Sequence, residues 1–447
     1  MRIAVIGGGI GGLVAARALV RAGIDAHVLE AGPRPGGVVE TSAQGGYVRE
    51  HAASSFLGGP PHGALALCKE LGVEIEKASP RARTRWVYLD GKLRALPRSP
   101  LDLVTSDLLT WRGKLDLLGE PFRRAGLGDD ESVHAFAARR FGAEAARAIF
   151  APLVTGIYAA DAHAISLPAG FPRLAALDVH GGMVRGMFVQ TARGIAGRLR
   201  GGKPPASTPR GLWAPKGGLG ALIAALVRDL GDRVRLSSRV TRIEPAERGV
   251  RVDGSHWDGA VLAIPAEDAA PLVAAPEFGD LATRLSAFHR APAALAYLGY
   301  PAAAVPGARD GFGFLAAHGE DIRVLGVVFE STVWSGRAPD GHVLLRCIFG
   351  GGRDPDAASL PDDALIAQAR RDLATALAVT AEPTHASVVR WRRGVAQYGL
   401  GHRDRVRDAT ALARGQRIAL AGADYRGPGL NDLCADGATV VAEVSAW

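Results

Sequence analysis

Cysteine is scarce in this chain, and its scarcity excludes several kinds of site. Only three cysteines occur among 447 residues, and Cys68, Cys347 and Cys434 lie far apart. No Cys-x-x-Cys pair, zinc motif or disulfide framework is therefore available, and a reducing compartment fits this usage. The twelve histidines also show no metal-ligand spacing, so the sequence predicts no metal site.

Long apolar runs are also missing. No stretch reaches the roughly 18 consecutive apolar residues that a membrane-spanning helix needs. The apolar start resembles a signal peptide, but Arg17 and Arg21 follow it without a convincing cleavage site. No serine lies in a Gly-x-Ser-x-Gly turn, and no Gly-Lys pair is followed by serine or threonine, which argues against a hydrolase elbow and a P-loop.

Acidic residues are few in two segments. Residues 81–124 hold ten Arg and Lys against five Asp and Glu, and residues 179–203 hold five Arg and Lys without any acid. These segments account for more than the whole formal charge of +8. Such patches suit an anionic membrane surface or an acidic ligand. Nucleic acid is disfavoured as a partner because no nucleic-acid-binding motif accompanies the charge.

Glycine, in contrast, is abundant, and its first cluster carries a specific pattern. Gly7-x-Gly9-x-x-Gly12 lies between the apolar run 2–6, a predicted buried strand, and a helical pattern. The first glycine permits a tight turn, the second lets a pyrophosphate approach the backbone, and the third lets the helix pack on the strand. Glu30 ends the next predicted strand, where a carboxylate binds ribose hydroxyls. Together these features predict a Rossmann-type dinucleotide site.

The residues after Glu30 favour FAD over NAD. The string Glu-x-x-x-Arg-x-Gly-Gly, with Arg34, Gly36 and Gly37, resembles the FAD-binding amine oxidase and desaturase superfamily. Arg34 can neutralise a pyrophosphate, and the glycines allow the backbone to pass close to a flavin. The segment RVTRIE resembles the one whose backbone meets the adenine, here at Val240. The C-terminal segment LAGADYRGPGLNDLCADG resembles the last flavin-binding segment, which implies contacts from Gly422, Gly429, Leu430 and Asn431.

Longer segments resemble one family within this superfamily, the oxygen-dependent protoporphyrinogen oxidases. They are residues 131–174, 83–97, 311–315, 325–341 and 397–402. The resemblance implies FAD-dependent oxidation of protoporphyrinogen IX to protoporphyrin IX, with O2 as acceptor and hydrogen peroxide as by-product. Oxidation of coproporphyrinogen III is the close alternative, and its additional propionates would call for a more basic pocket. Amine oxidases, carotenoid desaturases and a non-enzymatic lipid-binding escort are more distant alternatives.

Individual substrate-site residues follow from the same resemblance. Arg85 matches the arginine that pairs with a porphyrinogen propionate, and Gly156 matches a glycine whose backbone lines the site. Apolar residues that sandwich the tetrapyrrole are matched by Phe312, Leu315 and Val328. No catalytic acid or base is identified, because the flavin carries the chemistry.

The chain departs from the family pattern at several positions. Ile348 stands where relatives carry Phe or Met, and Ala52-Ala53 stands where they carry Gly-Pro. Some relatives have an arginine where this chain has Ser54. Arg81 and Arg83 alternate with Arg85 on one expected strand, have no family counterpart, and are expected to be solvated or to face lipid.

The family implies an α/β fold in which a Rossmann-type FAD-binding domain is interwoven with a β-sheet substrate domain and a helical, membrane-associated domain. The expected division assigns 1–80, 205–270 and 391–447 to the FAD domain, 81–97 and 271–390 to the substrate domain, and 98–204 to the helical domain.

The second basic run is the expected membrane contact within the helical domain. Met183, Val184, Met187 and Phe188 would face lipid there, or alternatively form a helix face buried in the protein. We expect a cytoplasmic protein peripheral to the cytoplasmic face of the membrane, and a second copy of the chain is a candidate partner.

Overall fold

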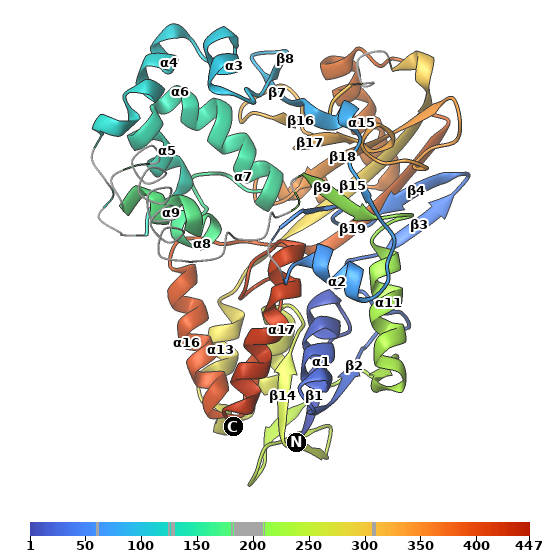
Figure 1. Ribbon diagram of the computed structural model, residues 1–447, viewed down its shortest axis with the longest axis vertical. Helices are drawn as coiled ribbons and strands as arrows, with labels where there is room; N and C mark the ends of the chain where they lie inside the picture. The colour runs from blue at the N-terminus through green and yellow to red at the C-terminus, as the bar shows by residue number, and fades with distance from the viewer. Residues whose placement is uncertain are drawn as a thin grey trace, which may run out of the picture.

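The computed structural model describes residues 1–59, 62–123, 126, 130–179, 182, 209, 211–305 and 310–447. The second basic run, including Met183, Val184, Met187 and Phe188, lies outside these residues apart from 179 and 182. Figure 1 shows a nucleotide region at the bottom, which contains the predicted dinucleotide site and both chain ends, a large sheet at the upper right and a group of helices at the upper left. The mixed α/β architecture expected from the sequence is confirmed.

A five-stranded parallel sheet forms the centre of the lower region. Its strands, in spatial order, are β10 (Val234–Arg235), β2 (Asp25–Leu29), β1 (Arg2–Ile6), β14 (Gly259–Leu262) and β20 (Ile418–Leu420). They come from three distant parts of the chain, as Figure 1 shows by their colours. Strands buried on both faces have near-continuous apolar sequences, and RIAVI and GAVL follow that rule.

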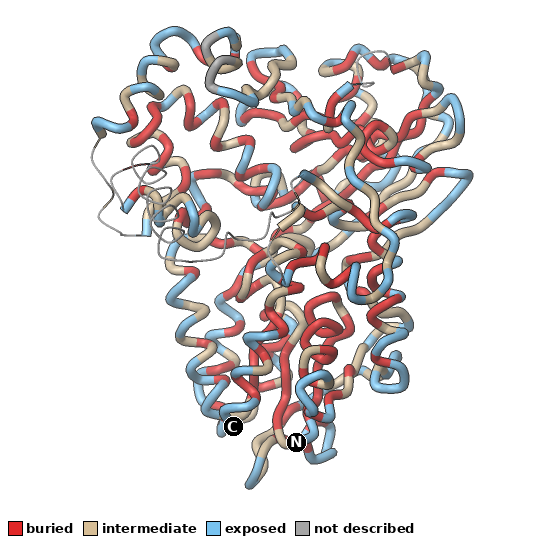
Figure 2. The backbone as a smooth tube through the Cα atoms, in the orientation of Figure 1, coloured by how far each residue is buried: buried red, intermediate tan, exposed pale blue. Residues whose placement is uncertain are grey.

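Helices and a small antiparallel sheet cover the two faces of this sheet. One face packs on α1 (Ile10–Arg21), α2 (Ala64–Glu70), α11 (Gly220–Leu230) and α17 (Leu430–Ser445). The other packs on β11 (Ile243–Pro245), β12 (Val250–Val252), β13 (Ser255–Trp257), α12 (Ala266–Ala269), α13 (Leu281–Ser286) and α16 (His402–Gly415). Between these layers β14 and β20 are buried along their length and β1 is buried after its first residue, as the central red strands of Figure 2 show.

The upper sheet has seven strands. In spatial order they are β19 (His385–Ala396), β15 (Arg290–Pro301), β18 (His342–Gly350), β17 (Gly326–Phe329), β16 (Gly313–Ala316), β7 (Arg85–Leu89) and β8 (Lys92–Ala95). All neighbours are antiparallel except β16 and β7, which run parallel. Helix α15 (Asp362–Leu377) packs on one face of this sheet, and the opposite face is turned toward the remaining regions.

The three arginines of the segment 81–85 do not share one strand, so that expectation is wrong. Arg81 and Arg83 lie in η1 (Pro80–Arg83), a 3-10 turn, and only Arg85 belongs to β7. Pro80 occupies the first position of the turn, and the Ser79 hydroxyl accepts a hydrogen bond from the Arg81 N–H. The cap therefore favours a 3-10 turn here, although the alternating arginines resemble a strand pattern. The Arg81 side chain pairs with Asp310 at 3.1 Å.

The helical region packs against the β7 side of the upper sheet. It contains α3 (Pro100–Thr105), α4 (Trp111–Leu118), α5 (Val133–Phe141), α6 (Ala143–Ala145), α7 (Ala151–Tyr158), α8 (Leu167–Gly170) and α9 (Pro172–Val179). Val87 and Leu89 of β7 belong to the same buried cluster as α5 and α7. Within the part of the chain that the structure describes, no helix is long and apolar enough to cross a membrane.

Two further small sheets join the regions. Strand β9 (Leu212–Pro215) lies between β5 (Phe56–Leu57) and β6 (Ile75–Lys77), and β3 (Thr41–Gln44) pairs with β4 (Tyr47–Glu50). The chain between β4 and β5 passes from the hairpin to the junction of the nucleotide region and the upper sheet.

Candidate active site

The glycine cluster forms an open cradle at the carboxyl end of β1. Gly7 has φ +107°, and a methyl group on Gly12 would overlap the Gly7 carbonyl oxygen, so both positions require glycine. At Gly9, in contrast, no atom beyond its chain neighbours lies within 4 Å of the place of a Cβ. Helix α1 begins here without a side-chain cap, so its first N–H groups face that open space. The space fits a pyrophosphate.

Glu30 lies beside this cradle at the end of β2. Its carboxylate accepts hydrogen bonds from the N–H groups of Gly8 at 2.6 Å and Gly32 at 2.7 Å. The Glu30 carbonyl accepts a hydrogen bond from Ser238 at 2.7 Å, so the segment that leads to Val240 runs along the same edge. The predicted ribose and adenine residues thus lie on neighbouring segments, and their contacts with the cofactor stay predictions.

The loop after Glu30 closes over the first glycines. The Gly36 N–H donates to the Gly8 carbonyl at 2.7 Å, and a Cβ on Gly37 would stand 3.2 Å from the Gly9 Cα. The Arg34 guanidinium bonds the Gly37 carbonyl at 3.0 Å and pairs with Glu40 at 2.8 Å. In the structure, Arg34 therefore fixes the loop, and its predicted contact with pyrophosphate stays a prediction.

The C-terminal segment reaches the cradle from the opposite side. Gly422 has φ +107° and its Cα would lie 3.4 Å from a Cβ on Gly11, yet the space beside its own Cβ position is open. Gly429 caps α17, whose first residue is Leu430. The Asn431 amide donates to the Leu57 carbonyl and accepts from the Ala64 N–H, both at 2.9 Å. Asn431 therefore joins the C-terminal segment to β5 and α2.

The predicted substrate residues gather on one face of the upper sheet. Arg85, Gly313, Val328 and Arg346 form one cross-strand row, and Leu315, Gly326 and Ile348 form the next row on the same face. The Phe312 ring joins the apolar cluster of Val328 and Ile348, and the Arg85 guanidinium carbon lies 5.3 Å from the centre of that ring. A Cβ on Gly156 would lie 3.0 Å from Leu315, which places α7 against this face.

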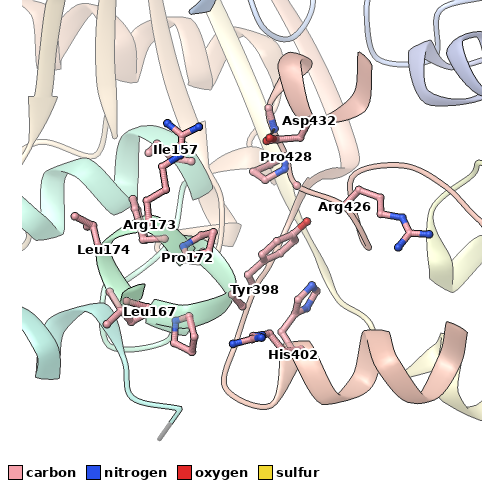
Figure 3. Close-up of a pocket in the computed structure, with 18 of the residues that line it drawn as sticks. Ile157, Leu167, Pro172, Arg173, Leu174, Tyr398, His402, Arg426, Pro428 and Asp432 are labelled. Carbon is pink, nitrogen blue, oxygen red and sulfur yellow. Dashed lines mark hydrogen bonds between the residues drawn. The ribbon is translucent and has the colours of Figure 1, made fainter. Parts of the chain in front are cut away.

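A cavity of about 1550 Å³ opens between the helical and nucleotide regions. Among the predicted residues, its lining includes Gly156 of the substrate set and Gly429, Leu430 and Asn431 of the cofactor set. The predicted substrate residues of the upper sheet are not part of this lining. Figure 3 shows Leu167, Pro172 and Arg173 on one side of this space and Tyr398, His402 and Pro428 on the other. Arg403, Arg407, Arg414 and Arg426 also belong to the lining. The Arg426 guanidinium pairs with Asp436 and Glu443, and that of Arg407 pairs with Asp404 and Asp408.

Tyr398 and His402 are residues of this cavity to which the sequence analysis assigned no role. Their rings stack with centres 3.9 Å apart, and the Tyr398 hydroxyl donates to the Ala423 carbonyl at 2.6 Å. Burial lowers the pKa of His402 to about 4, so its imidazole is neutral at physiological pH. The resemblance of residues 397–402 to the family is the signal in the sequence that points to these two residues.

The sequence analysis also missed two buried ion pairs beside the predicted substrate residues. Glu50 pairs with Arg337 at 2.9 Å, and Arg346 pairs with Glu330 at 2.9 Å, with all four side chains almost fully buried. Burial raises the pKa of Glu50, against the opposing effect of Arg337. Ser54, where some relatives carry arginine, accepts a hydrogen bond from the Arg346 guanidinium at 3.2 Å. This chain therefore has a serine at position 54, and a guanidinium from β18, that of Arg346, contacts it.

Comparison with known proteins decides the family. The model of the family described as flavin-containing amine oxidoreductase matches residues 10–439. The chain belongs to this family. The open cradle around Gly9 and Gly422 fits a dinucleotide form of flavin, and FAD is therefore its cofactor. The protein is an FAD-dependent oxidoreductase.

Curated relatives cover nearly the whole chain. The chloroplastic protoporphyrinogen oxidase of Oryza sativa subsp. japonica is 32% identical, over 97% of this chain and 86% of the relative. The coproporphyrinogen III oxidase of Mycobacterium leprae is 33% identical, over 91% of this chain and 90% of the relative. The coproporphyrinogen III oxidase of Bacillus subtilis is 26% identical, over 100% of this chain and 98% of the relative.

Solved structures support the fold. A crystal structure from Exiguobacterium sp. 255-15, provisionally described as a protoporphyrinogen oxidase, has a TM-score of 0.82 and 23% identity, covering 100% of this chain and 98% of that one. Wild-type putrescine oxidase bound to putrescine has a TM-score of 0.71 and 18% identity, with both chains covered completely. At these identities the likeness establishes the shared fold alone.

We expect Gly9→Val to weaken FAD binding at least tenfold, which corresponds to about 1.4 kcal/mol, because the side chain fills the open space of the cradle. Titration of the apo-protein with FAD, followed by flavin fluorescence, measures the effect. Gly415→Val is the matched control, since Gly415 also has open space at its Cβ position but ends α16 away from the cradle. Equal FAD affinity in both variants would contradict the assignment of the cradle.

Proposed function

We propose that this chain oxidises protoporphyrinogen IX to protoporphyrin IX in porphyrin biosynthesis, with O2 as the acceptor. The observation that carries the proposal is the apolar face of Phe312, Leu315, Val328 and Ile348, with the Arg85 guanidinium at its edge. The relative from rice, which bears the name protoporphyrinogen oxidase, supports it over nearly the full chain.

The chemistry of the face suits an amphipathic macrocycle. Aliphatic side chains and one aromatic ring offer a broad apolar surface for a tetrapyrrole. Arg85 is exposed, so a propionate that it binds can remain in contact with water at the rim. An arginine can hold a carboxylate through two parallel hydrogen bonds, and that geometry fixes the orientation of the ring on the face.

Bound FAD supplies a two-electron acceptor, and the residues of the chain need to hold, orient and desolvate the substrate beside it. Gly156 has no side chain, which lets α7 lie directly against Leu315 and brings the α7 backbone close to the sheet. The apolar row of Leu315 and Ile348 excludes water from this part of the site. The proposal therefore requires no conspicuous acid–base pair.

Anaerobic mixing of the holoenzyme with protoporphyrinogen IX tests the proposal. We expect the visible absorption of the flavin to bleach, and porphyrin fluorescence to increase when O2 is admitted. A flavin that stays oxidised under these conditions would overturn the proposed reaction. A protein that purifies without flavin would instead revive the non-enzymatic lipid-binding alternative.

Coproporphyrinogen III is a second candidate substrate, favoured by the relatives from M. leprae and B. subtilis and by the basic lining of the cavity. Arg173 and Arg403 belong to that lining, and additional propionates would need such cations. Parallel turnover measurements on both porphyrinogens distinguish the substrates. Faster turnover of coproporphyrinogen III would overturn the choice of protoporphyrinogen IX while leaving the flavin chemistry intact.

Arg85→Ala should raise KM by about ten- to 150-fold, because a hydrogen bond to a charged group is worth roughly 1.5–3 kcal/mol. The flavin spectrum should not change, because Arg85 lies on the substrate sheet. Arg81→Ala is the matched control, since this neighbouring arginine pairs with Asp310 on the surface. Steady-state kinetics on the two variants measure the difference. Equal increases in KM would show that the arginines act together and that Arg85 is not the propionate anchor.

We also propose that the helical region binds an anionic membrane surface through α4. Trp111, Leu115 and Leu118 lie on one face of this helix and are 70%, 66% and 66% exposed, and Phe122 beyond its end is 91% exposed. The Lys114 ammonium lies 4.9 Å from the centre of the Trp111 ring, so positive charge accompanies the apolar stripe. Such a helix suits the plane of a lipid interface. The site would be the cytoplasmic face of the membrane.

Trp111→Ser combined with Leu115→Ser should reduce binding to vesicles of mixed anionic and zwitterionic lipid several-fold, because the apolar area available for insertion decreases. Co-sedimentation with these vesicles measures the fraction of bound protein. Leu412→Ser on α16, another exposed apolar position, is the control. Unchanged binding of the α4 variant would contradict the assignment.

The homodimer stays a prediction, and sedimentation velocity of the wild-type protein tests it.

A further inference from the structure

One buried guanidinium connects the substrate sheet to a loop beside the cofactor segments. Arg346, on β18, is only 6% exposed and lies on the face that carries Val328 and Ile348. Its guanidinium donates to the Ala52 carbonyl at 2.7 Å and to the Ser54 hydroxyl at 3.2 Å. The remaining edge of the group pairs with Glu330 at 2.9 Å. Arg346 thus contacts two different positions of the chain between β4 and β5.

The same short segment is held at its other end by the C-terminal cofactor segment. The Leu57 carbonyl accepts the hydrogen bond from the Asn431 amide at 2.9 Å. Ser55 and Phe56, between the two attachment points, line the cavity together with Leu430. The segment 52–57 therefore runs from the substrate sheet to the N-terminus of α17, and polar contacts fix both ends.

The burial of this arginine calls for an explanation. A buried charge is costly unless it is paired, and an apolar residue at the same position would often be at least as stabilising. Glu330 compensates the charge of Arg346, but Glu330 is not needed if the position is apolar. What the pair adds is two directed hydrogen bonds to the segment 52–57, which an apolar side chain cannot provide.

A second buried pair at the same junction does not make these contacts. Arg337 pairs with Glu50 at 2.9 Å, and its exposed fraction is 2%. The Arg337 guanidinium donates to Glu50, and the Arg337 backbone carbonyl accepts a hydrogen bond from the Val48 N–H. Arg337 therefore resembles Arg346 in charge and burial but holds the β4 side of the junction.

We propose that Arg346 is a positioning residue that fixes the segment Ala52–Leu57 beside FAD and so couples the substrate sheet to the cofactor. This inference rests on the chain's being a flavoenzyme and not on which porphyrinogen it oxidises. FAD affinity and the environment of the bound flavin should therefore depend on the guanidinium of Arg346, even in the absence of any substrate.

Arg346→Ser removes the guanidinium and should weaken FAD binding at least tenfold. Titration of the folded apo-protein, followed by flavin fluorescence, measures the affinity. The visible circular dichroism of bound FAD should also change, because the segment beside it loses its attachment. Arg346→Lys keeps the charge for Glu330 but cannot span both Ala52 and Ser54, so we expect an intermediate affinity.

Moving the guanidinium provides the sharper test. Because the Ser54 hydroxyl lies 3.2 Å from the Arg346 guanidinium, an arginine at position 54 can reach the same place and pair with Glu330. Ser54→Arg alone should weaken FAD binding, since two guanidinium groups then compete for one carboxylate. Ser54→Arg combined with Arg346→Ser should restore most of the affinity, which a double-mutant cycle reports as strong coupling.

Arg337→Ser is the matched control, because it breaks the other buried pair of the junction. Adding Ser54→Arg to Arg337→Ser should not raise the FAD affinity of that variant, whatever the melting temperature of the variant. Wild-type affinity and an unchanged flavin spectrum in both Arg346→Ser and Arg346→Lys would overturn the inference, as would the absence of rescue in the double variant. If the wild-type protein itself does not bind FAD, the cofactor assignment is wrong, and the inference about Arg346 fails with it.

Discussion

The close contact between α1 and β1 at Gly12 is the constraint on which the site depends. Since no side chain fits between Gly12 and the Gly7 carbonyl, the helix lies directly on the strand and presents its N-terminus at the carboxyl end of the sheet. The Gly36 loop and the Gly422 turn then approach the same point from other parts of the chain. The cradle exists because three distant segments meet where this one contact places the helix.

The order of the strands explains how the upper sheet, which carries the predicted substrate residues, is joined to the region of the cradle. The chain leaves the parallel sheet after β2 and again after β14, and each excursion contributes to the upper sheet. The pairing of β7 with β16 joins the two excursions into one surface. On β7, Trp86 and Tyr88 face the core of the upper sheet, whereas Val87 and Leu89 face the helical region. One strand thereby fixes the helices, the sheet and Arg85 relative to one another.

Sequence reasoning succeeded where local backbone stereochemistry determines the structure. Gly7, Gly12 and the end of β2 at Glu30 could be predicted because only glycine fits the turn and the close packing. The strand expected across Arg81 and Arg85 was wrong because the Ser79–Pro80 cap starts a 3-10 turn. The pairs of Arg346 with Glu330 and of Arg337 with Glu50 could not be predicted, since alternation in a strand does not reveal a partner that folding brings near, 287 positions away for Arg337 and Glu50.

Directed polar contacts and apolar surface have different tasks in this active site. In the proposed reaction, apolar packing of the macrocycle on Phe312, Val328 and Ile348 would have little directional preference, so the macrocycle could slide or rotate on the face. Hydride transfer requires a defined position of the reacting carbon relative to the flavin, since rates fall steeply with small misplacements. Arg85 can fix the substrate on the sheet, and Arg346 can fix the loop beside the cofactor relative to the same sheet. Both arginines lie in one cross-strand row, so a single strand register sets both distances at once.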